Sequence, residues 1–276
     1  MDLILIDGNN ILVRSHYGRA EVLDPTGRPI QGIAGVVNTV LHHYLKSKSS
    51  QIVICWDAPG KTFRHELYPE YKANRNAHPQ ELLDQIVRAK KALENLGLCQ
   101  IEVAGYEADD CIGTLAYQST QENKIVSIVS GDRDLWQLIS RNVFVEYWPI
   151  KKPKKLFTLQ SFSEQFQIDP GQIIDYKALV GDASDNIPGV PGIGDKTVWP
   201  LLQQGLTLKD LLVKPDLLKP SQAKKLEQYK EQALMCRKLV TLACNISLTL
   251  PEKRINIRSD IARLTLRTLG FHQMSA

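Results

Sequence analysis

The sequence lacks the features that mark membrane, secreted and zinc-binding proteins. It contains no run of about 18 apolar residues, so no membrane-spanning helix is expected. The start MDLILIDGNN has neither a basic segment nor a small-residue cleavage site, so no signal peptide is expected. The five cysteines show no zinc-finger spacing and lie mostly in apolar runs, which favours buried, reduced thiols in a cytoplasmic protein.

A strong excess of one charge is also missing. The net charge of +4 is too mild to indicate nucleic-acid binding on its own. The distribution says more, because basic residues gather at 71–79, 149–156 and 219–230 while acids cluster at short sites. A basic surface around an acidic pocket suits a phosphate polymer held near bound cations. Any single Lys-rich loop is by default only a solvated surface.

Short apolar runs alternate with helical patterns in the first 160 residues. Strands are expected at LILID, QIVIC, 100–104, 124–130 and FVEYW, with helices at about 33–45 and 79–96. This alternation predicts an α/β fold with a central, mostly parallel sheet flanked by helices. From about residue 160 the pattern is helical, so we expect an α/β domain at 1–160 and a helical domain at 161–276. The last helix is expected at 260–271.

Seven acidic residues share one position relative to these strands. In a parallel sheet the ligand site lies beyond the carboxyl ends of the strands. Any one of these acids alone would be a helix cap or a turn former, whereas together they predict an acidic pocket. They follow four expected strands: Asp7, then Asp57, then Glu107, Asp109 and Asp110, and finally Asp132 and Asp134.

Such a pocket is electrostatically strained without cations, and all-oxygen ligands suit Mg²⁺ or Mn²⁺. Two such ions about 4 Å apart could activate a water molecule and stabilise the leaving oxygen of a phosphodiester. In the stretch YEADD, helical spacing predicts that Glu107 and Asp110 share one helix face while Asp109 points elsewhere.

The stretch 175–197 is the informative part of the second half. Asp182 and Asp185 stand close to Lys177 and could add to the acidic site. Glycines around Pro191 precede a helix expected to start near Asp195, which is the pattern of a helix–hairpin–helix at about 175–205 that grips a nucleic-acid backbone. Pro200 falls inside the following helix, so that helix is expected to start later or to kink.

Five sequence motifs occur along the chain in this order: LILIDGNN, FRHELYPEYKANR, YEADD, VSGDRDLWQL and LVGDASDNIPGVPGIGDKT. Over residues 1 to about 245 their order and spacing resemble the bacterial and phage 5′-nucleases. These are the flap endonucleases and the 5′-3′ exonuclease domain of DNA polymerase I. The resemblance implies a PIN-like fold, a helical arch at about 62–96 and a helix–three-turn–helix motif. The chain has no room for a polymerase domain, so a free-standing nuclease is expected.

The resemblance also implies residue roles. Lys72, with Arg75 nearby, matches the active-site cation at the foot of the arch, and Tyr71 matches an aromatic that stacks on the base beside the scissile bond. Metal-binding carboxylates are implied at Asp7, Asp57, Glu107, Asp109, Asp110, Asp132, Asp134, Asp182 and Asp185. DNA contacts are implied at Arg14, Arg64, Lys177, Gly189, Gly192, Gly194 and Lys196, and potassium binding at the carbonyls of Val190 and Ile193.

The sequence hypothesis is a structure-specific 5′-nuclease acting in DNA replication or repair. It would use two Mg²⁺ or Mn²⁺ ions, with K⁺ at the hairpin, and cut DNA near single-strand/double-strand junctions to leave a 5′-phosphate. Its expected partner is DNA with a 5′ flap or 5′ end, or an RNA primer in a duplex, bound by a cytoplasmic monomer.

Two alternatives stay open. The first is a PIN-like ribonuclease, against which the arch block and the hairpin argue. The second is a non-catalytic DNA-binding protein, against which the nine acids argue, because carboxylates near DNA weaken binding unless cations neutralise them.

Overall fold

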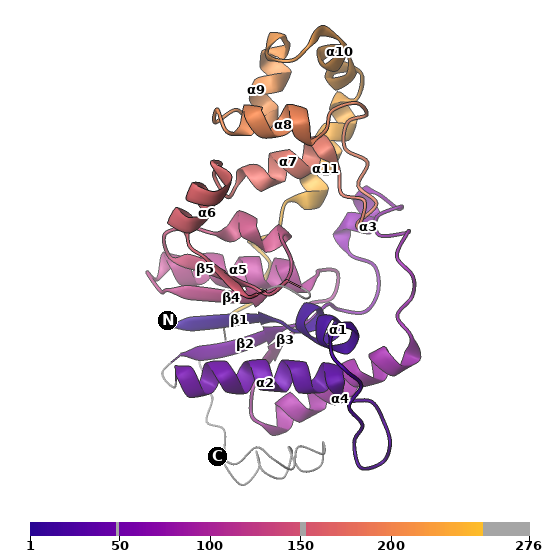
Figure 1. Cartoon of the computed structure of the whole chain (residues 1–276), viewed down its shortest axis with the longest axis vertical. Helices are drawn as coiled ribbons and strands as arrows, with labels where there is room; N and C mark the ends of the chain where they lie inside the picture. The colour runs from indigo at the N-terminus through magenta and orange to yellow at the C-terminus, as the bar shows by residue number, and fades with distance from the viewer. Residues whose placement is uncertain (48–49, 150–152, 251–276) are drawn as a thin grey trace.

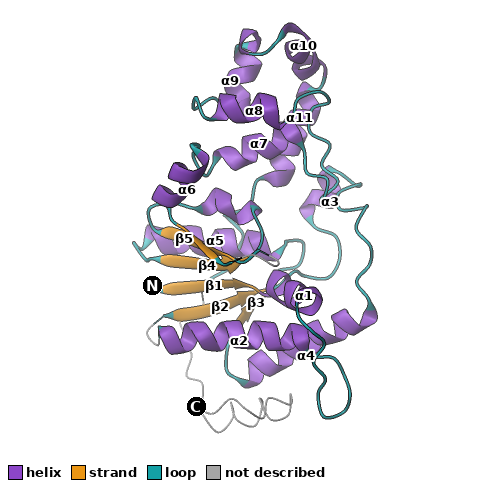
Figure 2. Ribbon diagram, viewed as in Figure 1, coloured by secondary structure: helices purple, strands orange, loops and turns teal. Residues whose placement is uncertain are grey.

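The computed structural model describes residues 1–47, 50–149 and 153–250. An α/β part carries a six-stranded sheet, and an all-helical part follows it (Figures 1 and 2). The strands are β1 Leu3–Asp7, β2 Gln51–Cys55, β3 Cys99–Ile101, β4 Val126–Ser130, β5 Val143–Tyr147 and β6 Lys155–Phe157. The helices of the α/β part are α1 Gly8–Gly18, α2 Gln31–Lys46, α3 Phe63–Leu67, α4 Gln80–Asn95, α5 Ala108–Gln121 and the 3₁₀ helix η1 Asp134–Leu138.

The helical part contains α6 Leu159–Phe166, α7 Gln172–Val180, α8 Asp195–Leu202, α9 Leu208–Val213, η2 Pro215–Leu217, α10 Pro220–Gln228 and α11 Lys230–Val240. The helix expected at 260–271 lies outside the described residues. In the described part of the chain, no helix is long and apolar enough to cross a membrane. All five cysteines are free thiols.

The sheet has the strand order β3-β2-β1-β4-β5-β6. Strands β1 to β5 pair in parallel, and β6 pairs antiparallel with β5. Every strand predicted from the sequence is present, and the predicted fold class is confirmed. The edge strand β6 was not foreseen, because its three residues carry too little pattern to stand out from a Lys-rich loop.

Two hydrophobic cores cover the two faces of the sheet. Alternate residues of a strand face opposite sides, so Ile4 and Ile6 pack with α1, α2 and α4 while Leu3 and Leu5 pack with α5. The second of these cores continues without a break into α7, α8 and α11. The helical part is therefore packed onto the α/β part. The carboxyl ends of the strands lie next to the place where the two parts meet (Figure 1).

The predicted arch region is only partly helical. Thr62 caps the short helix α3, turns follow at 69–75, and α4 begins at Gln80, close to the predicted start at 79. Within the turns Lys72 takes a left-handed backbone conformation with φ of +57°. Its N–H donates to the carbonyl oxygen of Asp185 at 2.9 Å, which fixes this strained residue beside the helical part.

Helix α8 rules out one of the two alternatives expected for Pro200, the later start. The helix begins directly after Gly194 and includes Pro200, so it does not start later. Pro200 cannot donate to the carbonyl of Lys196, but both residues are exposed and water can take that bond.

Candidate active site

Carboxylates from distant parts of the sequence meet in one pocket at the carboxyl edge of the sheet. The pocket has a volume of about 200 Å³, and Lys72, Arg75 and Tyr71 also line it. Seven of the nine predicted carboxylates line it: Asp7, Asp57, Glu107, Asp109, Asp132, Asp134 and Asp185. Asp182 lies in an adjoining cleft that shares Asp132, Asp134 and Asp185 with the pocket.

Short polar contacts hold the acids that follow β1 and β4. Asp7 caps α1 by accepting from Asn10 N at 3.0 Å, and it accepts from Ser130 Oγ at 2.7 Å. Ser130 Oγ also accepts from Asp132 N at 3.0 Å, so this buried hydroxyl bridges the two aspartates. The sequence analysis missed Ser130, although its place directly before the Gly-Asp of VSGDRD was a usable signal.

Two asparagines were missed in the same way. Asn9 Oδ1 accepts from Asp57 N at 3.0 Å, and Asn10 Oδ1 accepts from Gly131 N at 2.8 Å. These bonds join the ends of β1, β2 and β4, which carry three of the acids. The adjacent pair in IDGNN was visible in the sequence, but its partners lie 48 and 121 residues away.

The start of α5 corrects one expectation about the three acids. Glu107 is the helix N-cap and has an extended backbone (φ −92°, ψ 163°), so helical spacing does not apply to it. Glu107 and Asp109 line the pocket, whereas Asp110 is 0% exposed and faces inward. Asp110 accepts from Arg64 at 2.7 and 2.8 Å. The structure therefore contradicts the implied metal-ligand role of Asp110.

Burial makes the remaining acids costly to ionise. Burial raises the pKa of Asp7 from 3.8 to about 7, and the nearby charges of Asp57 and Asp132 add to the shift. Burial likewise raises the pKa of Asp57, Asp109 and Asp132. The pocket thus concentrates carboxylates whose charge needs compensation.

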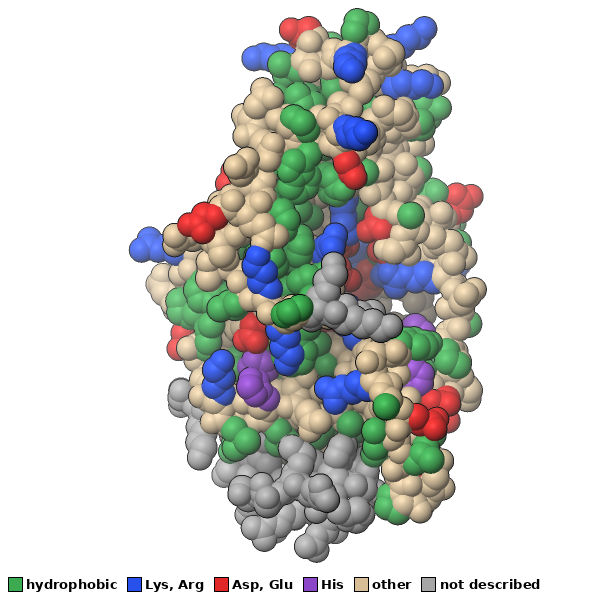
Figure 3. All heavy atoms as spheres, in the orientation of Figure 1, with side chains coloured by type: hydrophobic (Ala, Val, Ile, Leu, Met, Phe, Trp, Pro, Cys, Tyr) green, Lys and Arg blue, Asp and Glu red, His purple; other side chains and the backbone are tan. Residues whose placement is uncertain are grey.

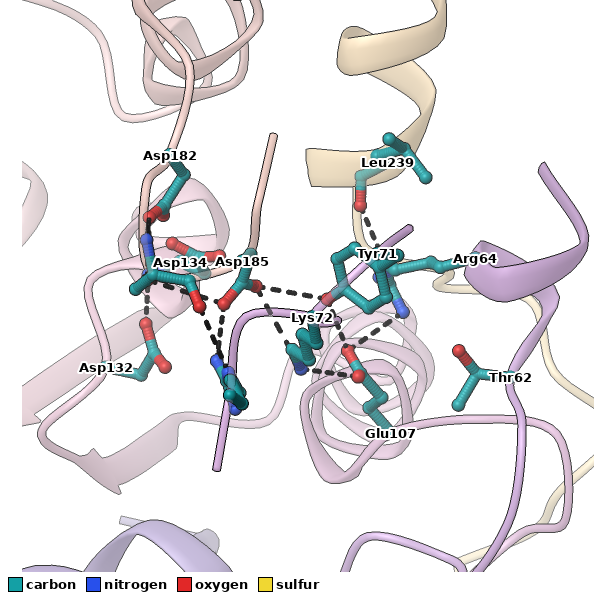
Figure 4. Close-up of polar contacts among 12 residues, drawn as sticks. Thr62, Arg64, Tyr71, Lys72, Glu107, Asp132, Asp134, Asp182, Asp185 and Leu239 are labelled. Carbon is teal, nitrogen blue, oxygen red and sulfur yellow. Dashed lines mark hydrogen bonds and ion pairs between the residues drawn. The ribbon is translucent and has the colours of Figure 1, made fainter. Parts of the chain in front are cut away.

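Three basic side chains supply part of that compensation (Figure 4). Lys72 Nζ lies 2.5 Å from Glu107 Oε1 and 3.9 Å from Asp185 Oδ2, and Arg75 pairs with Asp185. Lys177 pairs with Asp134 and, at 2.7 Å, with Asp182. Burial alone would lower the pKa of Lys72, but the charges of Glu107 and Asp185 outweigh it and raise that pKa. Within the described ranges, no three acidic, His or Cys side chains are arranged to hold a metal ion as they stand.

Arg64 and Tyr71 are buried and line the acidic pocket, and their implied contacts with DNA stay a prediction. Arg64 is 1% exposed and donates to Asp110 and Glu107. Tyr71 is 3% exposed, and its hydroxyl lies 3.1 Å from both Glu107 Oε2 and Asp185 Oδ2. In this structure the Lys72 ammonium lies 4.9 Å from the centroid of the Tyr71 ring, and every donor of Arg64 is paired within the protein.

Close backbone packing fixes the conformation of the predicted hairpin where it begins. Gly189 has φ of +61°, and a Cβ there would overlap the backbone of Val180 and Gly181. Val190 and Ile193 are buried, whereas Gly192 (φ +83°) and Gly194, the N-cap of α8, face open space. Lys196 is exposed in the first turn of α8.

A cleft of about 1160 Å³ joins the acidic pocket to α8. Arg14 and Lys177 line it together with acids of the pocket, and Trp199 of α8 lines it as well. Gly131 leaves room for the guanidinium of Arg14, which a Cβ at that position would overlap. Basic side chains surround the hollowed face and acidic ones lie inside it (Figure 3).

We expect the stability of the protein in EDTA to fall as the pH rises from 5 to 8. The folded state raises the pKa of Asp7, so it holds a proton that the unfolded chain has released, and this contribution is lost as the pH rises through about 7. Mn²⁺ should restore the melting temperature at pH 8, because it neutralises the ionised acids. Thermal melts of the wild type and of Asp7→Asn check this. Equal pH slopes for the two proteins would contradict it.

The parallel sheet, the acids at its carboxyl edge and the bordering lysines define the class of PIN-like nucleases. Residues 2–167 match the 5′-3′ exonuclease N-terminal resolvase-like domain, and residues 168–261 match the 5′-3′ exonuclease C-terminal SAM fold. The chain belongs to the 5′-3′ exonuclease family and is a nuclease.

Individual relatives agree with this assignment. The chain is 38% identical to the 5′-3′ exonuclease of Bacillus subtilis over 274 residues, which cover 96% of this chain and 92% of the relative. It is 37% identical to DNA polymerase I of Caldicellulosiruptor bescii, covering 90% of this chain but 30% of that protein. The crystal structure of the bacteriophage T5 flap endonuclease with DNA and metal ions has a TM-score of 0.70 at 20% identity, over 99% of this chain and 94% of that one. This last likeness shows a shared fold.

Proposed function

We propose that the protein is a structure-specific 5′-nuclease that cuts DNA near single-strand/double-strand junctions and leaves a 5′-phosphate. The observation that carries the proposal is the pocket itself. Seven carboxylates from segments up to 178 residues apart share about 200 Å³ with Lys72 and Arg75. Such a site suits a polyanionic substrate only when bound cations offset the acids.

The residues fit divalent cations. All candidate ligands are carboxylate oxygens, which Mg²⁺ and Mn²⁺ prefer. Asp7, Asp57, Asp109 and Asp132 have raised pKa values through burial, so their ionised forms need a counter-charge. The metal ions in the bacteriophage T5 structure support this proposal. When bound, two cations would acidify the attacking water and stabilise the leaving oxygen.

The chain's own residues would bind and orient the phosphate. Lys72 and Arg75 lie at the mouth of the pocket, where their side chains are 22% and 50% exposed. They can exchange a carboxylate for a non-bridging phosphate oxygen as the charge of the transition state develops. Arg14 and Lys177 would hold neighbouring phosphates along the cleft.

The duplex would lie on the hairpin. Gly192 and Gly194 leave the backbone open to a phosphate, and Lys196 adds a charge at the start of α8. Carbonyls at Val190 and Ile193 are the proposed K⁺ ligands. The DNA bound to the bacteriophage T5 protein supports a DNA substrate here.

Charge reversal of Lys196 should weaken duplex binding and flatten its salt dependence. Loss of one phosphate contact lowers the slope of log K against log salt by about 0.9. Binding titrations of Lys196→Glu in Ca²⁺ at several salt concentrations check this. Lys91→Glu reverses an exposed lysine on α4 and serves as the control. An unchanged slope in Lys196→Glu would show that another part of the protein binds the duplex.

The proposed function is tested with a 5′-labelled flap duplex in Mg²⁺, in parallel with excess EDTA and with single-stranded RNA. We expect metal-dependent cutting near the junction while the RNA stays intact. Tight binding without cutting would favour a DNA-binding protein, and preferential RNA cutting would favour a ribonuclease.

A further inference from the structure

Arg64 stands at the centre of a closed polar network. All of its donors are used: Nε donates to Leu239 O at 2.7 Å, Nη1 to Asp110 and Glu107 at 2.7 and 3.3 Å, and Nη2 to Asp110 and Thr241 O at 2.8 and 3.4 Å. The acceptors come from the start of α5 and from the end of α11. Arg64 itself begins the arch region, so one buried guanidinium ties three segments together (Figure 4).

Asp110 closes the network from the other side. Its two oxygens accept from Arg64, from Glu107 N at 3.1 Å and from Ala243 N at 2.9 Å. Four donors saturate a carboxylate, so Asp110 has no lone pair left for a cation. Its fixed position in turn orients Arg64 toward Glu107.

Glu107 connects this network to the pocket. Its Oε2 accepts from Arg64 Nη1 at 3.3 Å and from the Tyr71 hydroxyl at 3.1 Å, while Oε1 faces Lys72. Arg64 and Tyr71 are both buried, so they hold one carboxylate oxygen from the protein side and leave the other at the pocket. The Tyr71 hydroxyl also reaches Asp185 at 3.1 Å, on the segment that follows α7.

We propose that Arg64 and Tyr71 are positioning residues that act through Glu107 and set the geometry of the acidic pocket. Arg64 also donates to the backbone carbonyls of Leu239 and Thr241, so the position of α11 relative to the sheet is part of this geometry. The inference rests on the proposed function in one respect, namely that Glu107 serves as a cation ligand.

Arg64→Lys is the main test. A lysine keeps the charge but cannot serve five acceptors, so Glu107 should lose its fixed orientation. We expect Mn²⁺ affinity, measured by calorimetry without DNA, to fall by about tenfold or more, the range seen when a residue orienting a metal ligand is lost. Flap binding in EDTA should stay unchanged, because Arg64 does not reach solvent. Weaker DNA binding with a flatter salt dependence would support the DNA-contact role of Arg64 and overturn the inference.

Arg88→Lys provides the matched control. Arg88 also pairs with a buried aspartate, Asp24, but this pair ties α4 to the 22–30 loop, away from the acidic pocket. Both variants should melt at lower temperature, and only Arg64→Lys should lose Mn²⁺ affinity. A matched loss of stability with Mn²⁺ affinity unchanged in both would show that Arg64 is merely structural.

A double-mutant cycle with Glu107→Gln tests whether Arg64 acts through Glu107. We expect Arg64→Lys to add almost no further loss of Mn²⁺ affinity in that background, whereas additive losses would overturn the inference. Tyr71→Phe removes one hydroxyl and covers the case in which Arg64→Lys does not fold. It should weaken Mn²⁺ binding in the same direction, and an unchanged affinity would refute the Tyr71 assignment. Absence of Mn²⁺ binding or DNA cutting in the wild type would instead refute the proposed function.

Discussion

Asp132→Asn is expected to abolish DNA cleavage while leaving the affinity for a flap substrate in Ca²⁺ within a few-fold of the wild type. Asp132 follows β4 and lines both the acidic pocket and the adjoining cleft. Burial raises the pKa of its carboxyl, so its ionised form needs a compensating positive charge. Replacing that charge by an amide should lower the single-turnover rate by about 10³-fold or more, because losing even one preorganised electrostatic contact costs about 10²- to 10³-fold.

The substitution should spare the fold. Asp132 Oδ1 accepts from Asp134 N at 2.9 Å, and Asp132 N donates to Ser130 Oγ at 3.0 Å. An asparagine can keep both bonds because its carbonyl still accepts and its backbone is unchanged. Asp84→Asn, at an exposed position on α4, changes the same functional group outside the pocket and should cut at the wild-type rate. Cutting by Asp132→Asn at a substantial rate would refute its assignment as a metal ligand.

The position of the acids was predictable because it follows from topology. A buried apolar run with an acid directly after it identifies the carboxyl end of a parallel strand, and all such ends meet at one edge. Asp7, Asp57 and Asp132 needed no further information, and the structure brings them together as expected. The hairpin glycines were also predictable. A left-handed backbone, as at Gly189, favours glycine, and a glycine is visible in the local sequence.

The buried contacts of Arg64, Tyr71 and Asp110 were not predictable from their blocks. Whether a charged residue faces a phosphate or a buried partner depends on residues far away in the chain. Arg64 bonds Asp110 across 46 residues and Leu239 across 175. Tyr71 bonds Asp185 across 114 residues. Without these partners, FRHELYPEYKANR reads as a basic, aromatic loop, which is the composition of a nucleic-acid contact.

Lys72→Ala is expected to lower the single-turnover rate by about 10²-fold or more. The Lys72 ammonium lies at the pocket mouth, where its side chain is 22% exposed and can stabilise charge on a phosphate oxygen. Lys72→Arg keeps the charge and should retain more activity than Lys72→Ala. Lys90→Ala, which breaks an ion pair with Glu102 outside the pocket, should leave the rate unchanged. An unchanged rate in Lys72→Ala would remove this residue from the reaction.

The same variant should affect Mn²⁺ binding in the opposite direction. Lys72 lies 2.5 Å from Glu107 Oε1 and thus competes with a cation for that carboxylate. Removing the ammonium removes both the competitor and a like charge, so Mn²⁺ should bind Lys72→Ala at least as tightly as the wild type. Arg64→Lys should do the reverse and weaken Mn²⁺ binding, because it disturbs the carboxylate from its buried side. The two basic residues that contact Glu107 would then differ in the sign of their effect on Mn²⁺ affinity. Lys72 would act on the substrate, and Arg64 would hold Glu107 in place as a metal ligand.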